Sequence, residues 1–112
     1  MTTHHRSAKE RIASNEAFFR QINESVEYDY SASDYPGLIG FLCECGDTEC
    51  SEIVEMSRRE YEQVRGTSCR FAIVLGHETP GTEDILERHD RYAVLEKRSD
   101  VADLVERTDP RR

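Results

Sequence analysis

The chain has 112 residues and a formal net charge of −8, which is the size of one small domain. No apolar run approaches the roughly 20 residues that span a bilayer, and the N-terminus lacks the apolar core of a signal peptide. We therefore expect a cytoplasmic protein that does not bind membranes. The excess of acids also argues against nucleic-acid binding, which requires basic residues to neutralise phosphates.

Residues 8–27 predict an amphipathic N-terminal helix, because apolar residues and one amide recur there at helical spacing. This stripe consists of Ala8, Ile12, Asn15, Phe19, Ile22 and Val26. Ser7 and Glu10 have the spacing of a capping box, which favours a helix start at this point. The Tyr-rich residues 28–37 then predict a loop that closes at Pro36-Gly37.

Residues 38–45 and 50–56 predict two strands joined by a four-residue turn, as in a β-hairpin. Ser57 and Glu60 have the spacing of a second capping box, which predicts a short helix running to about residue 65. Gly66 is expected to end this helix in the left-handed conformation that glycine adopts after a helix.

Residues 69–75 are apolar on both faces, which predicts a central strand. Residues 84–88 and 91–97 predict two strands around His89-Asp90, and residues 100–107 predict a second short helix. The expected fold class is α+β, with the N-terminal helix, a small antiparallel sheet, two short helices and one structural zinc site. We expect residues 1–112 to form a single zinc-stabilised domain whose ends, 1–7 and 108–112, are flexible.

Three cysteines lie within eight residues, in the pattern C-x-C-x4-C formed by Cys43, Cys45 and Cys50. Residues 31–56 around them hold six acids and no Lys or Arg. Acidic neighbours oppose thiolate formation, so this composition suits the thiols only if a cation lies among them. Thiolates and imidazoles are the preferred ligands of zinc, and the motif therefore predicts a Zn²⁺ site.

A structural zinc ion needs a fourth ligand, for which Cys69, His77, His89, an acid or water are candidates. Cys69 and His77 flank one predicted strand, and eight extended residues span about 26 Å, so at most one of the two can reach the ion. His77 follows a glycine in a loop, where its ring can turn toward a metal, whereas Cys69 begins an apolar strand. We expect the metal ligands to be Cys43, Cys45, Cys50 and His77.

Other interpretations of the thiols remain open at this stage. A disulfide framework requires an oxidising compartment, C-x-C can form a redox pair, and four cysteines can hold an iron–sulfur cluster. Buried cysteines without a ligand are the plainest alternative. Residue types do not distinguish zinc from iron, although a mixed sulfur and nitrogen tetrahedron favours zinc.

The order of motifs resembles that of a family of small, uncharacterised bacterial proteins common in actinobacteria. The segments that carry the resemblance are Asn15-Glu16-x-x-Phe19-Arg20-x-x-Asn23-Glu24, Phe41-x-Cys43-Glu44-Cys45, Glu60-Tyr61-x-x-Val64-Arg65, Arg70-Phe71, Gly76-His77-Glu78 and Tyr92-x-Val94. The resemblance implies that His77 rather than Cys69 completes the metal site. It also implies that Asn15, Arg20, Asn23 and Arg65 are structural or interface residues, and it implies no activity.

A complete shell of three cysteines and one histidine leaves no position for a catalytic water. The sequence therefore predicts a non-enzymatic, zinc-binding accessory or regulatory protein that acts through contacts with a protein of basic surface. A redox- or metal-responsive thiol switch is the first alternative. A metal-dependent enzyme is the second, and it would require an open coordination position. The oligomeric state is not predicted.

Overall fold

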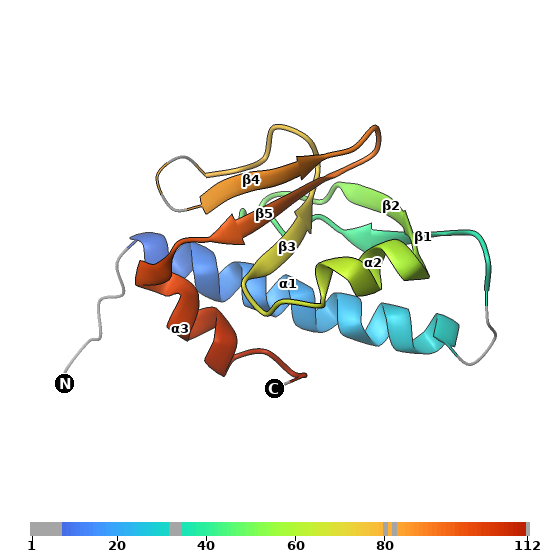
Figure 1. The fold of residues 1–112 in the computed structure, drawn as a ribbon, viewed down its shortest axis with the longest axis horizontal. Coiled ribbons are helices and arrows are strands. Elements are labelled where there is room, and N and C mark those ends of the chain that lie inside the picture. The colour runs from blue at the N-terminus through green and yellow to red at the C-terminus, as the bar shows by residue number, and fades with distance from the viewer. Residues whose placement is uncertain (1–7, 32–34, 80, 82, 112) are drawn as a thin grey trace.

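The computed structural model of the chain describes residues 8–31, 35–79, 81 and 83–111 (Figure 1). Its elements, in chain order, are α1 (Ala8–Ser31), β1 (Leu38–Leu42), β2 (Ile53–Ser57), α2 (Arg58–Val64), β3 (Arg70–Ile73), β4 (Glu83–Arg88), β5 (Ala93–Lys97) and α3 (Ser99–Arg107). The predicted α+β class is confirmed. The strands of the described segments divide between two small antiparallel sheets, with orders β1-β2 and β3-β5-β4.

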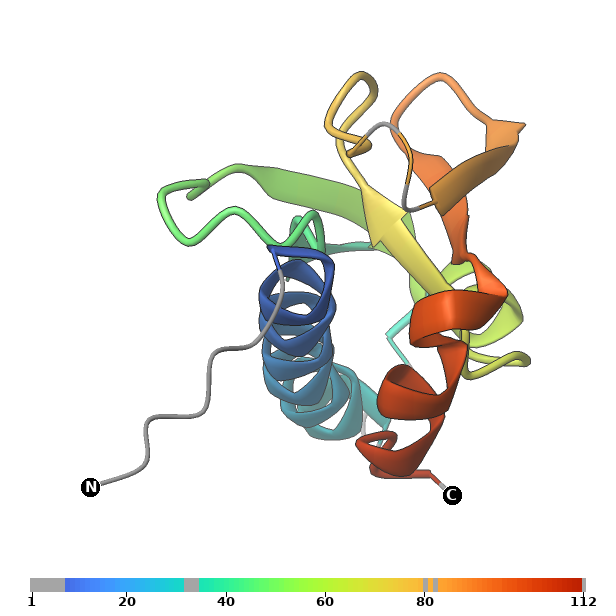
Figure 2. The same cartoon turned by 90° about the vertical axis from the view of Figure 1, so that its left-hand side faces the viewer.

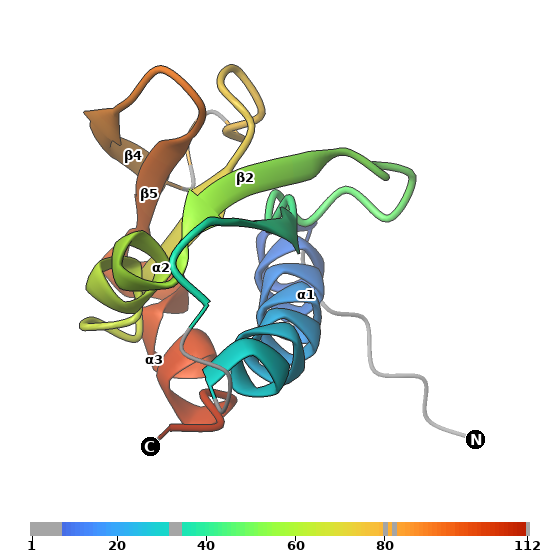
Figure 3. The same ribbon diagram turned by 90° about the vertical axis from the view of Figure 1, so that its right-hand side faces the viewer.

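The helices and the strands form separate layers. Seen along α1, the strands lie on one side of the molecule, and α1 and α3 lie beneath them (Figure 2). The opposite view shows α2 where β2 ends, on the same side of the strands as α3 (Figure 3). Of the helices in the described segments, none combines the length and the apolar character needed to cross a bilayer.

The predicted hairpin is confirmed, with shorter strands than the sequence indicates. β1 and β2 pair from Leu38↔Ser57 to Leu42↔Ile53, and one further backbone hydrogen bond, from Cys43 N to Glu52 O at 3.1 Å, extends the pairing. The inward side chains of the two strands are fully buried. All three cysteines of the motif therefore lie in the connection between the strands rather than within them.

β3 is an edge strand, so the prediction of a central strand over 69–75 is wrong, and β5 lies in the middle of the sheet. The apolar sequence of β3 has another cause, because its free edge is covered by the residue between the first two cysteines. Glu44 N donates to Ala72 O at 2.9 Å, and Ala72 N donates to the Glu44 carboxylate at 2.9 Å. An edge strand closed in this way is buried like a central one.

α1 continues to Ser31, so the prediction of a loop from residue 28 is wrong. No residue that breaks helices occurs before Pro36, and the first capping box cannot be assessed because Ser7 lies outside the described residues. The second capping box is confirmed by hydrogen bonds of 3.1 Å from Glu60 N to Ser57 Oγ and 2.8 Å from Ser57 N to Glu60 Oε1. Gly66 lacks the expected positive φ.

The buried face of α1 is polar, which differs from the predicted apolar stripe. The residues of α1 that are buried are Ala13, Glu16, Ala17, Arg20, Asn23 and Glu27, whereas the predicted stripe is partly buried and begins at the exposed Ala8. The two stripes are neighbours on the helix surface. The buried polar stripe of α1 requires hydrogen-bond or ion-pair partners from other elements, because an unpaired charge in a protein interior is costly.

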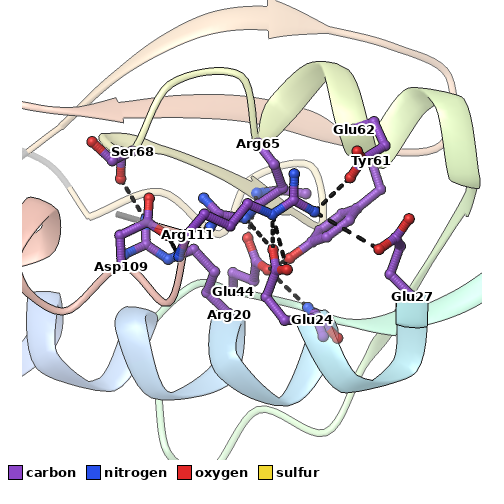
Figure 4. Close-up of polar contacts among 12 residues, drawn as sticks. Arg20, Glu24, Glu27, Glu44, Tyr61, Glu62, Arg65, Ser68, Asp109 and Arg111 are labelled. Atoms are coloured by element: carbon purple, nitrogen blue, oxygen red, sulfur yellow. Dashed lines mark hydrogen bonds and ion pairs between the residues drawn. The ribbon is translucent and has the colours of Figure 1, made fainter. Parts of the chain in front are cut away.

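Those partners form a network of charged side chains between α1, α2 and the end of the chain (Figure 4). Arg65 Nε lies 2.5 Å from Glu24 Oε1, and Arg65 Nη2 lies 2.5 Å from Asp109 Oδ1. Arg20 donates to Val105 O at 2.7 Å, and its guanidinium lies over the Phe71 ring, 4.6 Å from the ring centre. These contacts give Arg20 and Arg65 structural roles and link α1 to the chain beyond α3.

Candidate metal centre

The structure brings Cys43, Cys45, Cys50 and His77 together, and the donor atoms of these four side chains all lie within 4.8 Å of one another. The three cysteines come from the β1–β2 connection, and His77 comes from the loop after β3. The hydrogen bonds between Glu44 and Ala72 explain the meeting, because they align the connection with β3. This cluster could hold a metal ion.

Two of the separations within the cluster match the edges of a tetrahedral centre. Cys43 Sγ and Cys50 Sγ lie 3.6 and 3.7 Å from His77 Nδ1. A tetrahedron with metal–sulfur bonds of about 2.3 Å and a metal–nitrogen bond of about 2.0 Å has sulfur–nitrogen edges of about 3.5 Å. A neutral ring nitrogen has one lone pair, so two thiols at equal distance from Nδ1 fit a shared ion better than two hydrogen bonds.

The orientation of the His77 ring suits Nδ1 as the ligand atom. Its other nitrogen, Nε2, lies 2.9 Å from the Glu52 carboxylate. A carboxylate at this position accepts a hydrogen bond from Nε2–H. The proton then stays on Nε2 and the lone pair on Nδ1 is free to bind a metal, as in the carboxylate–histidine–metal arrangement of many proteins. The backbone turns here through Gly76, whose φ is 89°, and His77 N donates to Val74 O at 3.1 Å.

Glu44 lies between the first two cysteines, and its buried carboxylate accepts hydrogen bonds from three elements. The donors are Asn23 Nδ2 of α1 at 2.9 Å, Tyr61 Oη of α2 at 2.8 Å and Ala72 N of β3 at 2.9 Å. Burial raises the pKa of Glu44, and the three hydrogen bonds oppose that rise. Asn23 also donates to Leu42 O and accepts from Leu42 N, so the chain entering the site is held on both sides.

The environment of Cys43 and Cys45 opposes the ionisation of their thiols when no cation is present. Burial raises the pKa of Cys43, and the neighbouring Cys45 and Cys50 raise it further, although a hydrogen bond of 3.2 Å from Val74 N opposes the rise. Burial also raises the pKa of Cys45. A divalent ion reverses this balance, because a thiol that coordinates a metal does so as the thiolate.

Gly46 lets the connection pack closely on the first half of α1, as Figure 2 shows. Its φ is 83°, and a Cβ at this position would lie 2.8 Å from Ile12 O. Asn15 Nδ2 donates to Gly46 O at 3.0 Å, which gives Asn15 a structural role. The glycine after the second cysteine is therefore required both for its backbone conformation and for the missing side chain.

Gly46→Ala should destabilise the protein and weaken metal binding, whereas Gly81→Ala should have a smaller effect. Gly81 has a similar φ of 87°, but a Cβ there would meet nothing within 4 Å. Both variants lose about 1–2 kcal/mol through the left-handed backbone, and only the first adds a clash with backbone. Denaturant unfolding should separate them by at least about 1 kcal/mol. Equal midpoints would show that the Gly46 packing is unimportant.

The other two candidate ligands lie outside the cluster. The Cys69 thiol donates to the Glu106 carboxylate at 3.4 Å, and burial raises its pKa to about 11. His89 lies exposed at the β4–β5 turn, where it bonds Glu87 at 2.8 Å and stacks on Tyr92. The structure therefore places His77, and not Cys69, beside the three cysteines of the motif.

Composition and spacing gave no direct signal for the residues that hold the site in place. Glu52 contributes only to the acidic composition of its segment, and Glu44 and Asn23 stand out only as parts of the motifs in the family resemblance. Comparison of the chain with protein-family models, with curated proteins and with solved structures gave no match. The resemblance of the motifs to a bacterial family therefore stays a prediction, and the case for the site depends on its own geometry.

Proposed function

We propose that the protein binds one zinc ion through Cys43, Cys45, Cys50 and His77, and that this ion has a structural role. The observation that carries the proposal is the convergence of four donor atoms within 4.8 Å, two of whose edges have tetrahedral length. Four protein ligands fill the coordination shell of a structural zinc ion. The ion would link the β1–β2 connection to the loop after β3.

Metal analysis tests this proposal directly. Protein purified without chelator should contain one equivalent of zinc, and Co²⁺ exchanged into it should give the intense visible absorption and thiolate charge-transfer bands of a tetrahedral centre with sulfur ligands. Cys45→Ser should lose most of this metal, whereas Cys69→Ser should retain it. Equal loss in both variants, or a pure protein that is folded and takes up no metal, would contradict the assignment.

The proposed role is that of a non-enzymatic accessory or regulatory protein in the cytoplasm, which acts through contact with a protein of basic surface. Exposed acids surround the site, namely Asp47, Glu49, Glu52 and Glu55. Three thiolates and one dication change the local charge by −3 + 2 = −1, so metal binding leaves this face more acidic. Charge complementarity of this kind directs association with a basic partner.

Neutralising two of these acids should weaken the interaction with that partner. Glu49→Gln combined with Glu55→Gln removes two exposed charges without changing a proposed metal ligand. After crosslinking in the source cell, the yield of basic proteins bound to this variant should be at least about fivefold lower than the yield with the wild type. Glu62→Gln with Asp103→Asn removes the same charge from α2 and α3 and serves as the control. Equal recovery with both pairs, or partners without a basic surface, would contradict the proposal.

A further inference from the structure

The three cysteines of the cluster differ in their exposure to solvent. Cys43 and Cys45 are buried, with exposed fractions of 3% and 4%. Cys50 is only partly buried, and it lies in the exposed segment 47–53. Of the three cysteines, Cys50 therefore presents the largest exposed fraction to a reagent arriving from solvent.

The cysteines differ also in the hydrogen bonds that their sulfurs accept. Val74 N donates to Cys43 Sγ at 3.2 Å, and the backbone of Asp47 bonds the sulfur of Cys45. Among the described residues, no backbone N–H donates to Cys50 Sγ, whose polar neighbour outside the thiols is His77. Hydrogen bonds that stabilise a thiolate lower its nucleophilicity, so the sulfur of Cys50 is both the most exposed and the least stabilised.

We propose that Cys50 is the point at which a hydroperoxide attacks the metal-loaded site, and that the reaction releases the metal; this inference rests on the proposed zinc site. The Cys50 thiolate attacks one peroxide oxygen, the O–O bond breaks, and the departing alkoxide or hydroxide takes a proton from water. The sulfur is oxidised by two electrons to a sulfenic acid, and the peroxide is reduced. The oxidised sulfur no longer donates as a thiolate to the ion.

Cys45 is the cysteine that completes the oxidation. Its thiolate attacks the sulfenic sulfur of Cys50, a disulfide forms, and hydroxide leaves. Cys45 and Cys50 flank the same short turn, which is closed by a hydrogen bond of 3.0 Å from Cys50 N to Asp47 O, and the exposed residues 47–49 of the turn leave it room to adjust. Cys43 instead lies in the core and is held by Val74. Two ligands, Cys43 and His77, would remain, which is too few to retain zinc.

A second route to the cluster provides a competing outcome. An open pocket of about 440 Å³ borders the other side of the site, and Cys45 and His77 are among the residues that line it. A peroxide that entered there would attack Cys45 first. The small exposed fraction of Cys45 and its hydrogen bond with Asp47 favour Cys50, so the identity of the first oxidised sulfur decides between the two routes.

The experiment uses the zinc-loaded full-length protein, whose metal content is measured first. About one equivalent of hydrogen peroxide is added with a cyclic-dione probe that traps sulfenic acids, and zinc release is followed with a dye. The expected result is trapping at Cys50 at least about tenfold above Cys43 and Cys45. Without the probe, one zinc ion should be released for each Cys45–Cys50 disulfide that peptide mapping detects.

Two controls keep the outcomes separate. Cys69→Ser should oxidise and release zinc at the wild-type rate, and a haloacetamide applied to the loaded wild type should alkylate Cys50 first, which requires no variant at the site. First reaction at Cys43 or Cys45, or full zinc retention at about ten equivalents of peroxide, would overturn this inference alone. A protein that binds no metal before the oxidant is added would contradict the proposed function as well.

Discussion

Removing the metal with a chelator should lower the thermal unfolding midpoint by more than about 20 °C or abolish cooperative unfolding. Structural zinc contributes about 10–16 kcal/mol of binding free energy in zinc-finger peptides, whereas whole domains are stable by only about 5–15 kcal/mol. A loss of only part of that energy suffices, because each kcal/mol shifts the midpoint by about 4 °C at this chain length. Restoring zinc should restore the midpoint.

The structure explains why so large an effect is expected from one ion. Glu44 bonds β3, and Asn15 of α1 bonds Gly46, so the connection that carries the cysteines contacts α1 and β3. Without the ion, three thiols and an imidazole would face one another with no shared partner. The apo connection should therefore loosen, and the edge of β3 that it covers should become open to water.

Two cysteine variants distinguish the metal from the cysteine side chains themselves. Cys45→Ser should reproduce the loss of stability caused by the chelator, and the chelator should have no further effect on this variant. Cys69→Ser changes a buried cysteine in the same way, but away from the cluster, and the chelator should lower its midpoint as much as that of the wild type. If the chelated wild type unfolds at its original midpoint, the ion has no structural role.

The parts of the fold that the sequence predicted are those with local signals. The hairpin follows from alternation and turn residues, α2 from the capping box of Ser57 and Glu60, and the cluster from three cysteines in eight residues. Chain length showed that His77 and Cys69 could not both reach one ion, and the position of His77 in a loop after a glycine favoured His77. Each of these inferences depends only on residues close together in the sequence, or on how far apart the two ends of a strand must lie.

The parts that the sequence missed depend on contacts between distant residues. A hydropathy pattern treats Glu16, Arg20 and Asn23 as exposed, because it cannot know that each finds a partner elsewhere in the chain. Arg20 is paired with the carbonyl of Val105, which is 85 residues away. The central position of β5 was missed for the same reason, since the cover on β3 comes from the side chain and backbone of Glu44. Likewise, the ion pairs of Asp109 with Arg65 and of Arg111 with Glu24 and Glu62 had no signal in the sequence.

Lys97→Met should cost about 3–5 kcal/mol of stability, because Lys97 is the counter-ion of two buried carboxylates. Its Nζ lies 2.8 Å from Glu16 Oε1 and 2.7 Å from Glu83 Oε2, and none of the three side chains is exposed. Burial acts to lower the pKa of Lys97, but the two carboxylates outweigh it and raise that pKa. Burial raises the pKa of Glu16 well above its usual value, and Glu83 adds to the rise.

The stability deficit of Lys97→Met should depend on pH, in a direction set by the raised pKa of Glu16. A carboxyl group whose pKa is raised on folding contributes stability at low pH that is lost as the pH rises from the unfolded value toward the folded one. Lys97 opposes the rise at Glu16, so its removal should raise that pKa further. The deficit of Lys97→Met relative to the wild type should therefore grow once the pH passes the raised pKa that Glu16 has in the wild type, with both proteins loaded with metal at each pH.

An apolar replacement of the whole triad separates the loss of a counter-ion from the loss of packing. Glu16→Leu, Glu83→Leu and Lys97→Met together remove every charge of the group, and such replacements are often neutral or stabilising. The triple variant should recover most of the stability that the single variant loses in urea unfolding. The recovery should not be complete, because Glu83→Leu also removes a hydrogen bond of 2.6 Å that Thr79 N donates to Glu83 Oε1. Thr79 lies in the loop that carries His77. A single variant with the wild-type midpoint would show that the buried carboxylates need no counter-ion.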